Sequence, residues 1–233
     1  MLAAIKYATS DITTAVVNRV LAKEGAPIIC GSLPAYFDMK TMVDFMDVQS
    51  FLINLGCAEM MAHYGIPHAG TSGSGEGWGA DMLGTGMMWA NQITSIIGKV
   101  GLAPFVGSSL NSKAYCPLQT VLANDVIAQV RWFARGFAMD EKAIGADEII
   151  LEMEENRHFL TSESTLAVYQ NAYHQGVFPR ISLERWEELG NPRLEQLLRD
   201  RTLELLSNQE PPEDHDALIA KGEAFLKSQG FGL

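Results

Sequence analysis

The sequence predicts an α/β fold, either a parallel sheet or part of a (β/α)8 TIM barrel, followed by a helical extension at the carboxyl end. Short apolar segments that end in glycine and small hydroxyl residues alternate with longer segments of helical periodicity. These units recur about 35 to 40 residues apart, a spacing typical of right-handed βαβ units. After about residue 140 the pattern changes to helices alone.

Three segments are expected to form buried parallel strands, namely residues 26–32, 66–72 and 102–108. Each is a short apolar run bounded by Gly, Pro or a small hydroxyl residue, which is the pattern of a strand inside a parallel sheet. Because parallel barrels place their active sites at the carboxyl ends of the strands, the residues that follow each segment are candidates for function.

Helices are expected between and after these strands, because apolar residues recur there at helical spacing. We expect each stripe to be one buried helix face. The stripes consist of Val48, Phe51, Leu52, Leu55, Ala58 and Ala62; of Leu83, Met87, Ala90, Ile93 and Ile97; and of Leu122, Val126, Val130, Phe133 and Phe137.

The carboxyl-terminal part is expected to form a helical extension packed on the barrel, which divides the chain into residues 1–140 and 141–233. Its expected helices cover residues 161–173, 182–189, 192–206 and 215–228. Ser182 or the Asn191-Pro192 pair can open two of them. Charged residues dominate this part, so we expect it to act as a cap or as a contact in a homo-oligomer.

The composition argues against several classes of function. The chain has 233 residues, 47% of them hydrophobic, and a formal net charge of -11. The scarcity of Lys and Arg argues against a nucleic-acid partner. No apolar run reaches the ~18 residues of a membrane span and no signal peptide is recognisable, so we expect a cytoplasmic protein without membrane contact. Three scattered cysteines suggest buried, reduced thiols, and we expect no bound metal.

The most distinctive segment covers residues 70–81, in which glycines dominate between a strand end and a helix start. Backbone amides can approach a ligand closely at such a place. A dinucleotide site is disfavoured because no acidic residue lies between Asp81 and Asp125 to hold a ribose. A phosphate-binding loop is excluded because Gly98-Lys99 is followed by Val100. A flexible loop that merely turns the chain stays open as the alternative.

The sequence resembles the trimethylamine methyltransferases and their glycine betaine methyltransferase relatives. The likeness is carried by residues 25–32, 38–40, 64–67, 70–81, 97–102 and 158–160. The glycine-rich segment is closer to the trimethylamine branch. The resemblance implies a (β/α)8 barrel that moves a methyl group from trimethylamine or a related amine to the cobalt of a separate corrinoid protein. No cofactor is then expected on this chain, and Asp214-His215-Asp216 lacks the spacing of a corrinoid-carrying motif.

Two departures from the family pattern bear on activity. Family members are considerably longer, so the resemblance implies that Met1 falls inside the barrel and that the chain is a fragment or an internal-start product. Glu76 occupies the position that resembles the pyrrolysine of the trimethylamine enzymes. A carboxylate cannot form the amine adduct of that residue, so Glu76 either stands in for it or has replaced it and contributes charge.

Glu76 suits a methylammonium cation, since a carboxylate beside aromatic faces attracts quaternary ammonium. Tyr36, Phe37 and Trp78 are the candidate faces. In the alternative, these rings pack the barrel mouth and Glu76 points to water.

Five further residues complete the expected substrate site. Ser72 and Ser74 belong to the glycine-rich segment. Asp38 could orient the substrate or cap a helix. Asp81 could bind the substrate, although the positive end of a helix dipole is enough to explain an acidic residue at this position. His158 lies in a segment that resembles a family loop, with a structural histidine as the alternative.

Two rival functions stay open. A glycine betaine-type quaternary amine demethylase would need a cation such as Lys40 or Lys113 to meet the substrate carboxylate. An inactive fragment that needs its amino-terminal half would expose strand edges and tend to associate.

Overall fold

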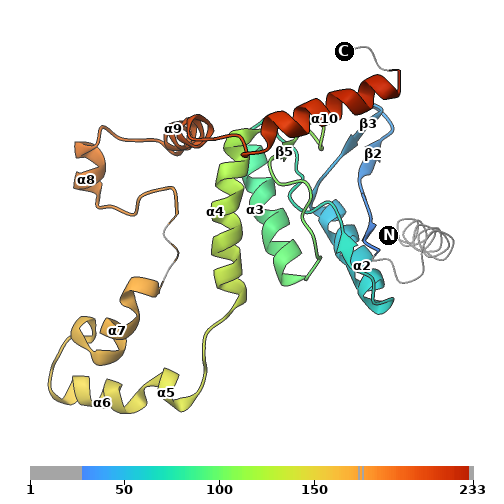
Figure 1. Ribbon diagram of the computed structural model, residues 1–233. Coiled ribbons are helices and arrows are strands. Elements are labelled where there is room, and N and C mark those ends of the chain that lie inside the picture. Colours follow the sequence, from blue (N-terminus) through green and yellow to red (C-terminus); the bar gives the residue numbers. More distant parts are fainter. Residues whose placement is uncertain (1–27, 173, 175, 231–233) are drawn as a thin grey trace.

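The computed structural model describes residues 28–172, 174 and 176–230 (Figure 1). It shows an α/β unit of short strands and three long helices, followed by shorter helices that extend away from this unit. The predicted α/β class is therefore confirmed, and the described residues form no closed barrel.

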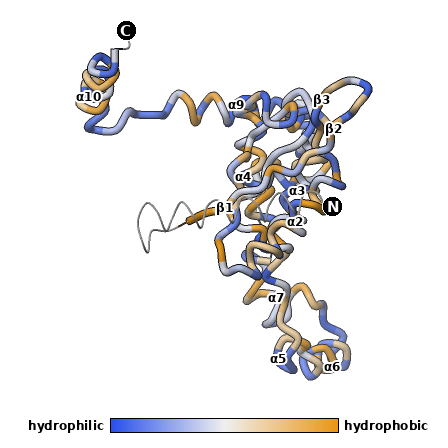
Figure 2. The backbone as a smooth tube through the Cα atoms, turned by 90° about the vertical axis from the view of Figure 1, so that its right-hand side faces the viewer, coloured by the Kyte–Doolittle hydropathy of each residue, from blue (hydrophilic) through white to orange (hydrophobic). Residues whose placement is uncertain are grey.

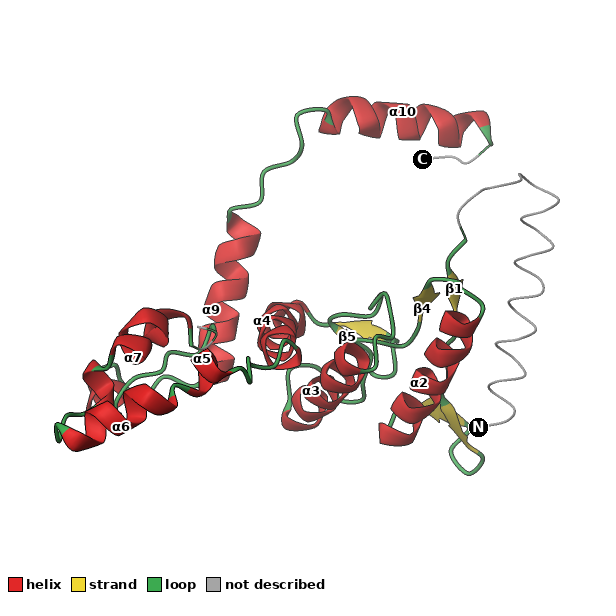
Figure 3. Cartoon of the chain, turned by 90° about the horizontal axis from the view of Figure 1, so that it is seen from below, coloured by secondary structure: helices red, strands yellow, loops and turns green. Residues whose placement is uncertain are grey.

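The centre of the α/β unit is a set of parallel strand positions. Strand β1 (Cys30–Gly31) pairs in parallel with β4 (His68–Ala69), and Ala69 forms a parallel bridge to Leu102. The three positions come from the three predicted strands in chain order, which confirms the βαβ arrangement. Figure 3 shows β1 and β4 side by side next to the first helix of the unit.

The strands are shorter and more exposed than predicted. Residues 26 and 27 of the first predicted strand lie outside the described residues. Ile29 is 58% exposed and Leu102 is 54% exposed, so the prediction of fully buried strands is wrong at these positions. The end of the third predicted strand turns into β5 (Ser108–Ser109), which pairs antiparallel with β6 (Ala114–Tyr115).

A second hairpin was not predicted. Strand β2 (Tyr36–Asp38) pairs antiparallel with β3 (Val43–Phe45). The tight turn between them is closed by the Asp38 carboxylate, which accepts hydrogen bonds from the Lys40 N–H and the Thr41 hydroxyl. Asp38 thus caps a turn and not a helix, because a short acidic side chain satisfies nearby backbone donors equally well in either setting.

Three long helices pack side by side, and the first of them also packs on β4. They are α2 (Val48–His63), α3 (Met82–Ile97) and α4 (Pro117–Ala134). The side chain of Asp47 caps α2 in a capping box with Ser50, and the side chain of Asp81 caps α3. Pro117 occupies the first position of α4, where its missing N–H costs no helical hydrogen bond.

The predicted helix positions are confirmed, but their buried faces differ from the predicted stripes. The residues of these stripes that are more than half exposed, and so were wrongly assigned to a buried face, are Val48, Leu52, Leu83, Ile97, Phe133 and Phe137. In α3 the buried side chains are mainly polar, namely Asn91, Gln92 and Ser95. Several of them bond to a neighbouring loop or to one another, which hydropathy spacing does not register.

Among the described residues, two apolar clusters form the core. Cys30, Ile53, Cys57 and Met61 pack β1 against α2. The larger cluster joins the α/β unit to the helical extension and consists of Met88, Leu122, Ala123, Val126, Val130 and Leu198. Two of the three cysteines are buried as expected, whereas Cys116 is only partly buried.

The part after residue 140 contains helices and no strand among its described residues, as predicted. Its elements are α5 (Glu141–Ile144), α6 (Ala146–Glu154), the 3-10 turn η1 (Phe159–Thr161), α7 (Glu163–Val168), the 3-10 turn η2 (Tyr169–Asn171), α8 (Leu183–Glu188), α9 (Leu194–Ser207) and α10 (His215–Ser228). The last three lie within the predicted ranges or within one residue of them.

The predicted helix over residues 161–173 is shorter than expected. Ser162 caps α7 through the Thr165 N–H, and the helix gives way to the turn η2 at Tyr169. Tyr173, the predicted end, lies outside the described residues. The division of the chain at residue 140 stays a prediction.

Helices α9 and α10 differ in how they meet the α/β unit. Helix α9 packs on α4 and buries Leu198. Helix α10 follows an extended linker and buries none of its residues, and Figure 2 shows it well separated from the rest of the chain.

Candidate functional site

The glycine-rich loop, residues 70–81, runs from the end of β4 to the start of α3. Its last residue, Asp81, accepts hydrogen bonds from the N–H groups of Trp78 and Gly84 at 2.7 and 2.6 Å. These bonds lower the pKa of the Asp81 carboxyl. Gly77 has a φ of 100°, and a Cβ there would lie 2.6 Å from Gly84. The loop therefore needs glycine at this position to pass close to α3.

Asn91 on α3 holds the first half of the loop. Its side-chain amide donates to the carbonyl oxygens of Thr71 and Ser74 at 3.2 and 2.7 Å. Its side-chain oxygen accepts from the Gly73 N–H at 3.1 Å and from the Ser95 hydroxyl. Because Asn91 is 1% exposed, these bonds fix the loop in a dry environment.

A second contact comes from residues 110–112, which we call the clasp. The N–H groups of Leu110 and Asn111 donate to the carbonyl oxygens of Gly77 and Gly75 at 2.9 and 3.3 Å. The Ser112 hydroxyl lies 2.7 Å from that of Ser74. The clasp thus contacts the loop on both sides of Glu76.

Glu76 lies at the centre of this arrangement and is partly buried. Desolvation raises the pKa of its carboxyl, and the nearby Asp47 carboxylate raises it further. The Glu76 side chain has no hydrogen bond or ion pair to any described residue. A partly desolvated carboxylate beside a second acid is a setting that favours a bound cation.

The other predicted residues of the loop differ in burial, because two are buried and one is exposed. Ser72 and Ser74 are buried, and Ser72 donates to Ser95 at 2.8 Å. Both therefore hold the loop in place. Trp78 is 86% exposed, so its ring extends into solvent instead of packing on the described residues.

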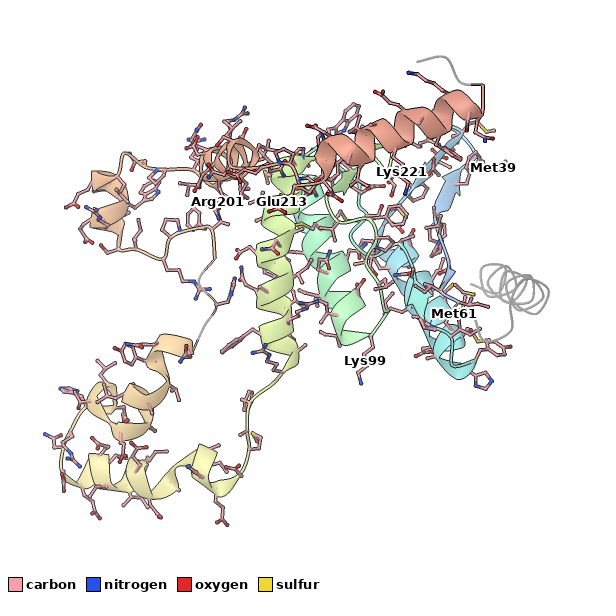
Figure 4. The ribbon with its side chains drawn as sticks, viewed as in Figure 1. Met39, Met61, Lys99, Arg201, Glu213 and Lys221 are labelled. Carbon is pink, nitrogen blue, oxygen red and sulfur yellow. The ribbon has the colours of Figure 1, made fainter. Side chains whose placement is uncertain are left out.

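The predicted aromatic pair lies on the β2–β3 hairpin. Tyr36 stacks on Phe45 with ring centroids 5.8 Å apart. Phe37, Asp38 and Phe45 line an open cavity of about 460 Å³. Figure 4 labels Met39 on this hairpin, at the end of the unit opposite Met61 and Lys99.

His158 lies away from the loop, in the helical extension between α6 and η1. It is exposed, and its ring forms no hydrogen bond within the part of the chain that the structure describes. The structure therefore does not bring His158 together with Glu76.

Sequence reasoning missed Asn91 and Asn111, which hold the loop, and Asp47, whose charge acts on Glu76. Asp47 had a recognisable signal, because an acidic residue before a helix is a common cap. Asn91 had a weaker one, as a polar residue inside an otherwise apolar helix. Asn111 had none, since its partners are up to 67 residues away in sequence.

Neither a metal-binding cluster nor a membrane-spanning helix occurs among the described residues. Within residues 28–172, 174 and 176–230, no group of three or more His, Cys, Asp or Glu side chains could hold a metal ion. In the same residues, no helix combines the length and the apolar character that crossing a membrane requires.

The parallel strand positions and the helices that follow them define an α/β protein, and its glycine-rich loop lies at the carboxyl end of a strand, where proteins of this class commonly bind ligands. A family model described as trimethylamine methyltransferase (MTTB) matches residues 1–229. The chain belongs to this methyltransferase family. No curated protein matches the sequence.

Proposed function

We propose that this chain takes part in moving a methyl group from trimethylamine, or a related methylated amine, to the cobalt of a separate corrinoid protein. The observation that carries the proposal is Glu76, a partly buried carboxylate without a hydrogen-bond partner among the described residues, on a loop held by α3 and by the clasp. The family match supports a methylated amine as the substrate.

The residues of the site would bind and orient the amine. The Glu76 carboxylate attracts its positive charge, and the fixed loop limits its orientations. The corrinoid of the partner protein supplies the nucleophile that accepts the methyl group. The role of this chain is then to align the carbon-nitrogen bond and to exclude water.

The glycine betaine alternative has less support. Lys113 forms an ion pair with Asp44, so its charge is already compensated. Lys40 lies in the hairpin turn, where its backbone N–H bonds to Asp38. Neither of the two expected cations forms an ion pair with Glu76 among the described residues, and Lys113 is already paired with Asp44.

The same proposal includes the barrel architecture, the localisation and the oligomeric state of the protein. The parallel positions at β1, β4 and Leu102 agree with three consecutive strands of a (β/α)8 barrel. We propose that these strands belong to a (β/α)8 barrel, that the protein works in the cytoplasm, and that the helical extension contributes to a homo-oligomer.

The test is a methyl-transfer assay with the protein, a reduced corrinoid protein and methylated amines as substrates. Methylation of the cobalt is followed by its visible absorption change. With Glu76 we expect transfer from a quaternary methylated amine, whose permanent charge the carboxylate attracts, and none from trimethylamine. With pyrrolysine at position 76 we expect transfer from trimethylamine. Turnover of trimethylamine by the Glu76 form would contradict the proposed role of pyrrolysine, and inactivity of both forms would contradict methyl transfer.

A further inference from the structure

The clasp has an unusual backbone. Leu110, Asn111 and Ser112 have φ values of 50°, 54° and 68°, which lie in the left-handed region that L-residues rarely occupy. Three such residues in succession persist only where surrounding contacts hold them. These contacts join the clasp to two separate elements.

Asn111 makes the decisive connections. Its side-chain oxygen accepts a hydrogen bond from the Met46 N–H at 3.0 Å, and its side-chain amide donates to the Asp44 carbonyl at 2.7 Å. Its own N–H donates to Gly75. One residue therefore ties the end of β3 to the glycine-rich loop.

The neighbours of these partners are the two acids of the site. Asp47 follows Met46 and Glu76 follows Gly75. Asp47 uses one carboxylate oxygen to cap α2 through the N–H groups of Gln49 and Ser50. The cap of α2 therefore fixes the position of Asp47, and the hydrogen bonds of the clasp to Gly75 and Gly77 fix the backbone on either side of Glu76.

We infer that Asn111 is a positioning residue that holds the Asp47 and Glu76 carboxylates on the same side of the site, where they jointly attract an amine cation. This inference rests on the proposed function. Asn111 need not touch the substrate, because it acts through the two backbone segments that it joins.

The test compares Asn111→Gly with Asn191→Gly. Glycine adopts the left-handed backbone readily, so Asn111→Gly keeps the clasp conformation and removes the two side-chain hydrogen bonds. Asn191 is an exposed residue with a φ of 56°, so Asn191→Gly is the same change away from the site. Circular dichroism confirms that both variants are folded.

Two quantities are measured by NMR: the pKa of Glu76 and the dissociation constant of tetramethylammonium. We expect Asn111→Gly to lower the pKa of Glu76 and to weaken binding about fivefold, with Asn191→Gly unchanged. Asp47→Asn keeps the helix cap and should lower the same pKa. If Asp47→Asn lowers it and Asn111→Gly does not, the inference is wrong while the proposed function stands. If tetramethylammonium does not bind the unmodified chain, the proposed function itself fails.

Discussion

The side-chain oxygen of Asn91 accepts a hydrogen bond from the Gly73 N–H at 3.1 Å, which joins a buried position of α3 to the glycine-rich loop. The same side chain donates to Thr71 and Ser74. The helix that follows the loop therefore holds the backbone of its first half through these hydrogen bonds.

Replacing Asn91 with Asp should destabilise the protein by roughly 2 to 4 kcal/mol, because a carboxylate cannot donate to the two carbonyl groups and would be buried. Urea unfolding measures the difference. The exposed Asn191→Asp serves as the control and should stay within about 0.5 kcal/mol of the unmodified chain. Equal stabilities of the two variants would show that Asn91 does not hold the loop.

The cap of α3 predicts a pH dependence. The pKa of Asp81 is lower in the folded protein because backbone N–H groups bond to its carboxylate. The stabilisation that the Asp81 carboxylate contributes is therefore complete above its unfolded pKa of ~3.9. It is lost as the pH falls through the lower pKa of the folded protein. Asp81→Ala should cost about 1 kcal/mol at pH 7, and the difference from the unmodified chain should shrink in acid. A difference that is constant with pH would contradict this role.

A buried histidine predicts a second pH effect. The ring of His68 lies 2.7 Å from both the Val100 carbonyl and the Ser32 hydroxyl. Since a carbonyl only accepts, Nδ1 carries the proton and Nε2 accepts from Ser32. Burial lowers the pKa of His68, so the unfolded chain binds more protons below pH ~6.5 and stability falls as the pH falls toward the folded value.

The measurement is urea unfolding at two pH values, roughly one unit above and one unit below the unfolded histidine pKa of ~6.5, for the unmodified chain, for His68→Gln and for the exposed His63→Gln. The loss of stability at the lower pH should be smaller in His68→Gln and unchanged in His63→Gln. An equal loss in all three proteins would assign the effect to other groups.

The packing of α9 on α4 predicts that a buried leucine of α9 contributes to stability. Leu198 of α9 is 2% exposed and packs in the core cluster on α4, whereas Leu203 of the same helix is 59% exposed. Leu198→Ala should cost about 3 kcal/mol and Leu203→Ala less than about 1 kcal/mol. Thermal unfolding of the two variants tests this, and similar midpoints would contradict the packing of α9 on α4.

The parallel order of the strands and the positions of the long helices could be predicted, because both depend on local periodicity. The two hairpins could not, because β2 and β5 are short and their pairing depends on turns closed by Asp38 and by the clasp. The glycine-rich loop was recognised from its composition. Its supports were not, since Asn91 and Asn111 reach their partners only after the chain has folded.

The most direct test of the central claim is NMR mapping of tetramethylammonium on the unmodified chain and on Glu76→Gln. We predict that the largest shift changes occur in residues 70–78 and that they are lost in Glu76→Gln, because the amide has no charge to attract the cation. Shift changes confined to the helices after residue 140, or unchanged binding by Glu76→Gln, would contradict the assignment of the amine site to the glycine-rich loop.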